Sequence, residues 1–396
     1  MFEKESHDVV IVGGGVNGCA VARELASDHD VLVLEQGQIA SKTTAKASGL
    51  ITNLYDYGEY TEATRYALDF FNDYDGTGHF SYTQKNFVEL LDPDVVDERR
   101  ETAQEYSDAG FEVSYLTVEE VEEQYPDAFI LDTIAGAIEY REGGRVDPYT
   151  FAMTLKEDAE DRGATFETGV TVEDILVDDG AVTGVQTTDG AVHAPTVIGA
   201  AGWHTRELVR PYMELPIRPY RAQTINLETE REFGDDYPIA LETSTHLYWV
   251  PEHSDELHVG GGAFFSADPP PVRSNITEEF RNFVAEGIHR FVPGMERARI
   301  ASDDICPTGM AGTPDGDPIY DEPEDGPEGL IVATGSNGQG IMAAPMAAAA
   351  VRAIISDTEP PFSRDPFRVT RFESRSPDFT SPHIPETPDQ IETDIP

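Results

Sequence analysis

The fold of this chain is decided near its start by HDVVIVGGGVNGCAVARELA, residues 7–26. The apolar run Val9–Val12 predicts a buried parallel strand, and it leads directly into a glycine-rich turn. Small and apolar residues then recur at helical spacing as far as Leu25. A second apolar run, residues 31–34, predicts another buried strand, which ends at Glu35. This order of strand, turn, helix and strand is typical of a βαβ unit in a parallel sheet.

The turn contains Gly13-x-Gly15-x-x-Gly18, and each glycine has a physical role. Gly13 permits the tight turn, Gly15 lets the backbone approach a pyrophosphate, and Gly18 lets the helix pack closely on the strand. The start of the helix offers free N–H groups and a partial positive charge to phosphates. Glu35 can accept hydrogen bonds from both hydroxyls of a ribose. The stretch therefore predicts a dinucleotide site, and a merely glycine-rich turn is the alternative.

Acidic residues dominate the composition, with 75 Asp and Glu against 27 Lys and Arg and a net charge of −48. Such a charge destabilises a compact state by self-repulsion unless salt screens it. An acidic chain that keeps 39% hydrophobic residues predicts a cytoplasmic protein of a salt-accumulating halophile. A disordered acidic binding partner is the alternative, but the regular strand and helix patterns argue against it. Because no basic stripe is present, we expect no nucleic-acid ligand.

The two cysteines, Cys19 and Cys306, lie far apart, with neither a Cys-x-x-Cys pair nor a histidine-rich neighbourhood. We interpret both as inert buried residues and expect no metal site. The N-terminus lacks the basic and long apolar segments of a secretory signal. The most apolar late stretch, residues 341–351, is too short to span a bilayer, so we expect no transmembrane segment.

The patterns along the chain predict a mixed α/β (α+β) fold with two interleaved domains. The first is a Rossmann-like domain with a parallel sheet, formed by residues 1–80, 145–212 and 306–372. The second is an antiparallel-sheet substrate domain, formed by residues 81–144 and 213–305. Residues 373–396 are polar and punctuated by proline, which predicts a mobile tail.

Several further segments occur in an order that points to one known family. They are residues 43–50, 144–148, 170–172, 198–203, 219–223, 313–318 and 329–345. Together with the opening turn, they resemble the FAD-dependent D-amino acid oxidase family, especially its glycine oxidase and sarcosine oxidase-like branch. The resemblance covers residues 6–356, and the acidic composition indicates a haloarchaeal-type member. It implies FAD extended across the Rossmann-like domain, with the antiparallel sheet covering the flavin ring.

A second glycine-rich turn, residues 335–340, follows an apolar strand and precedes a helix of small residues. N–H groups at the start of this helix are expected to face the pyrimidine edge of the flavin, where negative charge accumulates on reduction. A plain buried βα unit is the alternative. Thr43, Thr44 and Ser48 are expected to hydrogen-bond phosphate or ribityl oxygens, and the alternative role for them is helix capping.

The expected FAD contacts come from several stretches of the chain. They are Gly13, Gly15, Val16, Asn17, Gly18, Glu35, Gln36, Thr43, Thr44, Ser48, Gly49, Leu50, Val172, Ala201, Gly202, Trp203, Gly335, Asn337, Gly338, Gln339, Gly340 and Ile341. Lys46 stands where some relatives attach FAD covalently through a histidine. We therefore expect FAD to be held without a covalent bond.

The substrate side departs from the family pattern at Met310. In the glycine oxidase branch an arginine at this place binds the substrate carboxylate, and methionine cannot form that ion pair. The candidates to supply a positive charge instead are Arg221 first, and then Arg218, Arg65 and Lys46.

His246 and Tyr248 match positions that line the pocket in glycine oxidase-like proteins. Their spacing predicts neighbouring positions on one face of a strand. Tyr248 can hydrogen-bond a polar substrate group, and His246 can accept a proton near neutral pH. The alternative for both side chains is ordinary packing.

The predicted function is the oxidation of a C–N bond in a small amine or amino acid, with hydride transfer to FAD. One alternative is an FAD-dependent dehydrogenase of a 2-hydroxy acid or glycerol 3-phosphate. Another is a flavin-carrying subunit of a larger dehydrogenase complex. The sequence leaves open whether oxygen or a respiratory carrier accepts the electrons, and whether the chain forms a homo-oligomer.

Overall fold

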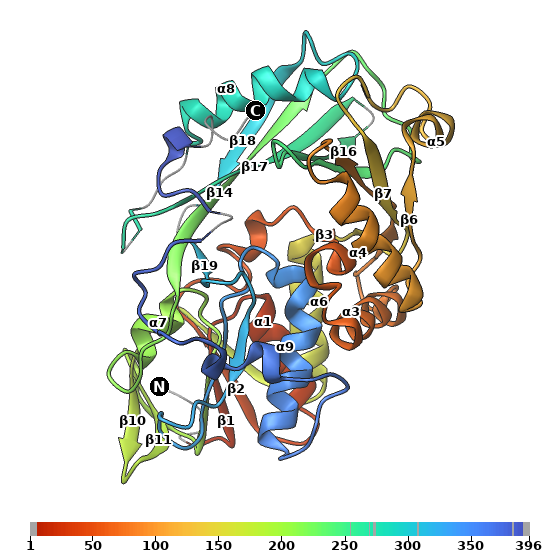
Figure 1. Ribbon diagram of the computed structural model, residues 1–396. Coiled ribbons are helices and arrows are strands. Elements are labelled where there is room, and N and C mark those ends of the chain that lie inside the picture. The colour runs from red at the N-terminus through yellow and green to blue at the C-terminus, as the bar shows by residue number, and fades with distance from the viewer. Residues whose placement is uncertain are drawn as a thin grey trace.

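The computed structural model describes residues 6–253, 255–268, 270–271, 275–306, 309–381 and 384–390. Two large sheets organise this part of the chain: a six-stranded sheet in the lower half of Figure 1 and a nine-stranded sheet in the upper half. The chain passes between the halves several times, so each sheet is built from segments that are far apart in sequence.

The six-stranded sheet has the strand order β20-β21-β13-β1-β2-β9. Its strands are β1 (Val9–Val12), β2 (Val31–Glu35), β9 (Thr165–Thr168), β13 (Thr196–Gly199), β20 (Ile319–Asp321) and β21 (Leu330–Thr334). All of them pair in parallel except β20, which runs antiparallel to β21 at the edge. The opening stretch therefore forms the predicted βαβ unit in the centre of this sheet.

Alternate residues of β1 face two different cores, as the two-residue repeat of a strand requires. Val9 and Ile11 pack with the helices α1 (Val16–Leu25), α3 (Thr61–Tyr74), α6 (Pro148–Asp161) and α9 (Gly340–Ile355). Val10 and Val12 pack on the other side, with β10 (Val172–Asp178), β11 (Ala181–Thr187) and β12 (Gly190–His193). The central strand is consequently buried on both faces.

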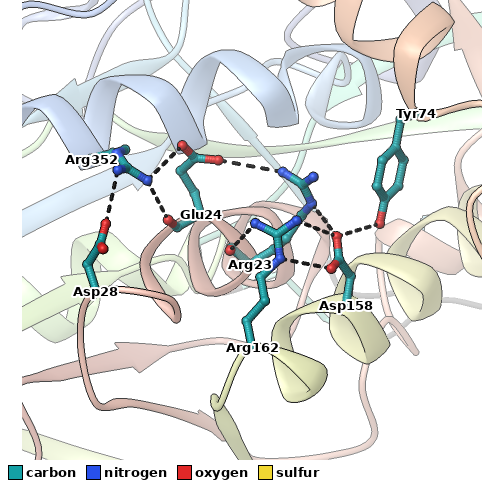
Figure 2. A network of polar contacts seen from close by, with 7 residues as sticks. All are labelled: Arg23, Glu24, Asp28, Tyr74, Asp158, Arg162 and Arg352. Atoms are coloured by element: carbon teal, nitrogen blue, oxygen red, sulfur yellow. Dashed lines mark hydrogen bonds and ion pairs between the residues drawn. The ribbon is translucent and has the colours of Figure 1, made fainter.

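A polar network joins α1, α6 and α9 at one end of this helical layer (Figure 2). Asp158 of α6 accepts hydrogen bonds from Arg23 of α1 at 2.7 Å and from Arg162 at 2.8 Å. Burial opposes ionisation of Asp158, but these arginines prevail and lower the pKa of its carboxyl. Arg352 of α9 reaches Glu24 of α1, with 3.3 Å between Nη1 and Oε1. The network fixes the two helices whose N-termini meet at the site described below.

The nine-stranded sheet has the order β18-β14-β17-β16-β15-β5-β7-β6, with β19 paired to β14. The strands are β5 (Phe87–Leu91), β6 (Val113–Leu116), β7 (Gly136–Tyr140), β14 (Arg218–Glu228), β15 (Ile239–Glu242), β16 (Tyr248–His253), β17 (Glu256–Phe265), β18 (Arg299–Ile305) and β19 (Met310–Gly312). Neighbours pair antiparallel except β5 and β15. In Figure 1, α8 (Glu278–Gly287) lies across the top of this sheet, on the side away from α1.

Shorter elements complete the structure. They are the strands β3 (Leu50–Ile51), β4 (Thr83–Gln84) and β8 (Gly144–Arg145), the α-helices α2 (Asn53–Tyr57), α4 (Val96–Asp108), α5 (Val118–Gln124) and α7 (His204–Val209), and the 3-10 helices η1 (Thr44–Lys46), η2 (Ile288–Arg290), η3 (Asp365–Phe367), η4 (Val369–Arg371) and η5 (Pro388–Gln390).

The predicted mixed α/β fold is confirmed by the parallel and antiparallel sheets. The strands of the two large sheets come from the two predicted sets of ranges, except that β19 joins the antiparallel sheet. The small sheet β3-β8-β4 contains strands from both sets, and the domain boundaries stay a prediction. Within the described ranges, no helix combines the length and the apolar character needed to cross a bilayer.

The C-terminal segment differs from the predicted mobile tail, because it is packed against the upper sheet. Ile384 is 4% exposed and packs with Tyr220 and Phe265. Glu386 accepts two hydrogen bonds from the Arg218 guanidinium, at 2.9 and 2.7 Å. One buried aliphatic residue and one bidentate ion pair thus anchor a segment that reads as polar overall. Residues 382, 383 and 391–396 of the predicted tail lie outside the described residues.

Candidate active site

The first of two cavities, with a volume of about 420 Å³, lies where β1, β2, β13 and β21 end. Parallel strands bring their carboxyl ends to one edge of a sheet, and ligands bind there in open α/β sheets. The N-termini of α1 and α9 both line this cavity. They supply N–H groups and positive dipole ends to whatever binds there.

The opening turn is tight enough to require its glycines. Gly13 has a φ of +115°, and a Cβ on it would lie 2.6 Å from the Ala200 carbonyl oxygen. A Cβ on Gly18 would lie 1.9 Å from the Gly13 carbonyl oxygen. Gly18 does not line the cavity; its role is the close contact of α1 with the turn. This agrees with the division of roles expected from the sequence.

Glu35 is held at the end of β2 by two backbone N–H groups. Its Oε2 accepts a hydrogen bond from Gly14 at 2.9 Å, and its Oε1 accepts one from Gly37 at 2.8 Å. The carboxylate lines the first cavity. Because each carboxylate oxygen can accept more than one hydrogen bond, Glu35 keeps capacity for a bound hydroxyl.

Two residues that line this cavity carry unpartnered amide oxygens. Asn17 Nδ2 donates to Ser336 Oγ at 3.3 Å, whereas Asn17 Oδ1 has no partner in the described structure. Asn337 Oδ1, in the second glycine-rich turn, is also buried without a partner there. Buried polar atoms are nearly always hydrogen-bonded, so these two oxygens indicate a polar ligand in this cavity. Gln339 Oε1, in the same turn, is likewise buried without a partner but does not line this cavity.

A second, larger cavity of about 1100 Å³ adjoins the first one. The two share the lining residues Ala47, Met310, Asn337, Gly338 and Ile341. The second cavity extends from there along β14 and β16 to α2 and to the anchored C-terminal segment. Two ligands bound in the two cavities would therefore meet at Met310 and Gly338.

Tyr248 lines the second cavity at the end of a chain of hydrogen bonds. Its hydroxyl lies 2.9 Å from Ser48 Oγ, which lies 2.9 Å from His258 Nε2. His258 Nδ1 lies 2.7 Å from Asn226 Oδ1. Burial lowers the pKa of His258 to about 4, so its imidazole is neutral near pH 7. The chain holds the Tyr248 ring rigidly at the cavity wall.

His246 also lines the second cavity but is not on the strand face that was predicted. β16 begins at Tyr248, and His246 lies in the preceding turn with a φ of +53°. This turn is stabilised by Glu242, whose carboxylate accepts hydrogen bonds from the backbone N–H groups of Ser244 and Thr245. The expected alternation of His246 and Tyr248 on one strand is therefore wrong, although both residues reach the same cavity.

Residues 8–354 match the family model described as FAD dependent oxidoreductase. The chain belongs to this family. Its cofactor is accordingly FAD. The lining of the first cavity fits that cofactor, and we call it the FAD cavity below.

Relatives with known activities include the 4-methylaminobutanoate oxidase (formaldehyde-forming) of Paenarthrobacter nicotinovorans, which is 27% identical over 94% of this chain. The sarcosine oxidase subunit beta of an Arthrobacter species is 31% identical over 65% of this chain. The matched region spans 47% of the first relative and 66% of the second. The glycine oxidase of Pseudomonas putida is 24% identical, with 91% of this chain and 98% of that enzyme covered.

Solved structures show the same fold. The L-proline dehydrogenase from P. horikoshii superposes with a TM-score of 0.84 at 22% identity, covering 93% of this chain and 98% of that one. The glycine oxidase from Geobacillus kaustophilus superposes with a TM-score of 0.80 at 22% identity, covering 94% and 100%. This chain therefore shares the overall fold of these two enzymes.

Most residues expected to contact FAD line the FAD cavity. They are Gly13, Gly15, Val16, Asn17, Glu35, Gln36, Thr43, Thr44, Val172, Ala201, Gly202, Trp203, Gly335, Asn337, Gly338, Gly340 and Ile341. Ser48, Gly49, Leu50 and Gln339 line the second cavity instead. The glycine geometry, the two helix N-termini and the unpartnered amides fit FAD, and the individual contacts stay predictions.

The three hydroxyls expected to contact FAD already have protein partners. Thr44 Oγ1 accepts a hydrogen bond from Val16 N at 3.2 Å, at the first turn of α1. Thr43 Oγ1 donates to the Gly309 carbonyl at 3.4 Å, and Ser48 belongs to the Tyr248 chain. For Thr44, the structure thus contains the capping contact named as the alternative.

Arg221 does not reach the second cavity, which corrects its assignment as the first candidate for a substrate anchor. It is 1% exposed, and its guanidinium donates to the backbone carbonyls of Cys306, at 2.6 Å, and Pro271. Strand alternation explains the error, because Tyr220 and Ala222 of β14 face the cavity and Arg221 faces the opposite side.

The other three cations also lie outside the lining of the second cavity. Arg218 pairs with Glu386, and Arg65 pairs with Glu142 and stacks over Phe111. Lys46 lies 2.5 Å from Asp304. Met310 does line the cavity, as predicted for the position that replaces the family arginine.

Sequence reasoning missed Arg99, Asp56 and Asp317, which line the second cavity. Arg99 of α4 is already paired with Glu89, at 2.7 Å and 2.8 Å. Burial raises the pKa of Asp56 to about 6, and it raises that of Asp317 to about 6. Asp317 lies within the family segment 313–318, which was a signal for it, whereas no segment singled out in the sequence contains Asp56.

Proposed function

We propose that this chain oxidises a C–N bond of a small amine or amino acid, with FAD as the acceptor of the hydride. The observation that carries the proposal is the junction of the two cavities at Met310, Gly338 and Ile341. A substrate in the second cavity would meet the flavin end of the cofactor there, which is the alignment that hydride transfer needs. The named relatives that oxidise amines support the same reaction class.

FAD supplies the two-electron acceptor when it is bound. The protein's own contribution is alignment and control of protons. Tyr248, fixed by Ser48 and His258, orients the polar group of the substrate. His246 is positioned on the cavity wall to take the proton that an ammonium must lose before its carbon can give up a hydride.

The charge of the second cavity disfavours the phosphate alternative. Phosphate recognition calls for a cluster of arginine and lysine. Among the described lining residues, Arg99 is the single arginine and there is no lysine, and Arg99 is already neutralised by Glu89. A subunit of a larger complex remains a second candidate, supported by the partial coverage of the first two relatives.

We further propose that FAD is held without a covalent bond and that the protein works in a salt-rich cytoplasm. Lys46, which stands where a histidyl linkage would be, forms an ion pair with Asp304 and does not line the FAD cavity. The net charge of −48 supports the salt-rich setting. Denaturant should therefore release FAD from purified protein without protease treatment.

An anaerobic substrate panel tests the proposed reaction. Holoprotein purified in high salt is mixed with N-methylated amines, amino acids, 2-hydroxy acids and glycerol 3-phosphate, and bleaching of the flavin absorption is followed. Bleaching by amines alone is expected. Bleaching by a hydroxy acid or by glycerol 3-phosphate, with none by amines, would overturn the proposal.

A further inference from the structure

The second cavity carries an unusual balance of charge for a site that would take an amino acid. Its described lining contains five carboxylates and one permanently charged cation. They are Asp56, Glu59, Asp315, Asp317, Glu386 and Arg99. His246 is the other lining residue able to carry a positive charge.

Half of these charged residues are compensated by partners. Arg99 pairs with Glu89, and Glu386 pairs with Arg218. Asp315 accepts two hydrogen bonds from Arg371, at 2.7 and 3.1 Å. These three lining residues therefore add little net charge to the cavity.

Asp56, Glu59 and Asp317 form no ion pair within the described structure. Asp56 accepts hydrogen bonds from the neutral groups Thr52 Oγ1, at 2.6 Å, and Gln339 Nε2, at 3.3 Å. Asp317 accepts one from the Tyr60 hydroxyl at 2.5 Å. Hydroxyls and amides leave the charge of a carboxylate in place, so these residues give the cavity a net negative charge.

An independent observation points to a ligand beside these carboxylates. Tyr57 is 1% exposed and lines the second cavity, yet its hydroxyl has no hydrogen-bond partner in the described structure. It follows Asp56 directly in α2. Buried hydroxyls nearly always have a hydrogen-bond partner, and a bound ligand would supply the partner that the Tyr57 hydroxyl lacks. An ammonium group can donate to this hydroxyl and to a carboxylate at once.

We propose that the substrate of this chain is a diamine or polyamine, oxidised at one nitrogen while its second ammonium group is held by Asp56, Glu59, Asp317 and Tyr57. This inference rests on the proposed amine oxidation and names its substrate class. Met310, in the place of a carboxylate-binding arginine, and the position of Arg221 outside the cavity both agree with it. Among the described lining residues, Arg99 is the one arginine and there is no lysine, and Arg99 is already paired with Glu89.

Three substrates of matched length test the proposal. N-methyl-1,4-diaminobutane carries a distal ammonium, N-methylbutylamine a distal methyl group, and 4-methylaminobutanoate a distal carboxylate. Anaerobic bleaching of holoprotein is measured against the concentration of each compound at one salt concentration. The diamine is expected to give an apparent KM roughly tenfold or more below that of N-methylbutylamine, because a charge-assisted contact has about that effect. The carboxylate should be the poorest of the three.

Glu59→Gln supplies the matched variant. Glu59 is exposed, so its replacement should leave the fold and the FAD content unchanged. We expect the variant to lose most of the preference for the diamine, measured as the ratio of the apparent KM for N-methylbutylamine to that for the diamine. Glu62→Gln, on an exposed position of α3 that does not line the cavity, is the control and should behave like the parent protein.

The outcomes separate this inference from the proposed function. If 4-methylaminobutanoate or another carboxylated amine bleaches the flavin best, the diamine proposal is wrong and amine oxidation stands. If no amine of any kind bleaches the flavin, both fail. If Glu59→Gln keeps the same preference for the diamine as the control Glu62→Gln, Glu59 does not hold the second ammonium and the proposed site is wrong.

Discussion

At the scale of single residues, the FAD cavity depends on positions where a methyl group does not fit. Gly18 is the clearest case, since a Cβ on it would fall 1.9 Å from the Gly13 carbonyl oxygen. The Gly13 carbonyl belongs to the backbone, and the position of a Cβ is fixed by the backbone. No change of rotamer can therefore relieve the clash. The α1 N-terminus would have to shift away from the turn that it covers.

Gly18→Ala is therefore expected to lower the free energy of unfolding by about 1–3 kcal/mol, as overpacking does, and to deprive the protein of most of its FAD. Gly234→Ala is the matched control, because a Cβ on Gly234 would have no other atom within 4 Å. The flavin-to-protein absorbance ratio and thermal unfolding measure the two effects. A Gly18→Ala protein with full FAD content would contradict the proposed role of this contact.

Residues of the site could be predicted from the sequence where their function is local. The glycines and Glu35 fall within one βαβ unit, so their spacing alone predicted their place. Asp56, Asp317 and Arg99 come from three separate segments and meet only in the folded chain. Arg221 was misplaced because one-residue alternation on β14 decides which side chain faces the cavity, and the sequence pattern there did not settle it.

At the scale of elements, the C-terminal segment acts as a wall of the second cavity. Thr380, Ser381, Ile384, Glu386 and Gln390 all line it. Its polar, proline-rich composition predicted a mobile tail, and composition could not reveal that one isoleucine and one glutamate anchor it. The helices and strands with clear periodicity were easier: the strand predicted at Val9–Val12 is β1 with the same bounds.

Ile384→Asp should release this wall, because a carboxylate cannot stay buried between Tyr220 and Phe265 without a partner. The loss of a buried aliphatic side chain costs about 1.5–3 kcal/mol of local stability, so the apparent KM of the substrate should rise roughly tenfold or more. FAD content should persist, since Ile384 does not line the FAD cavity. Ile300→Asp, at a position 42% exposed on β18, is the control. An unchanged KM for Ile384→Asp would show that the segment is not needed for substrate binding.

At the scale of the whole molecule, charge governs stability more than any one contact does. The ion-pair network of α1, α6 and α9 joins arginines to only a few carboxylates, whereas 75 acidic residues face 27 basic ones in the chain. Most carboxylates therefore repel one another across the surface. At molar salt the screening length is about 3 Å, against about 30 Å at 0.01 M.

The melting temperature should accordingly fall as salt is withdrawn from molar to low concentration. Differential scanning calorimetry of the FAD-loaded protein over a series of potassium chloride concentrations measures this change. Sucrose at matched osmolality is the control for effects of water activity. A melting temperature that stays constant or rises as salt is removed would contradict the halophilic interpretation.

The order in which the walls of the two cavities occur along the chain has a consequence for biosynthesis. The FAD turn at residues 13–18 is synthesised before β21 and α9, which close the same cavity more than 300 residues later in the chain. Thr380, Ser381, Ile384, Glu386 and Gln390, which line the second cavity, come after α9. A nascent chain can thus form the βαβ unit before it is able to retain FAD, which requires α9, and it becomes competent for substrate only after the segment that follows α9 has emerged.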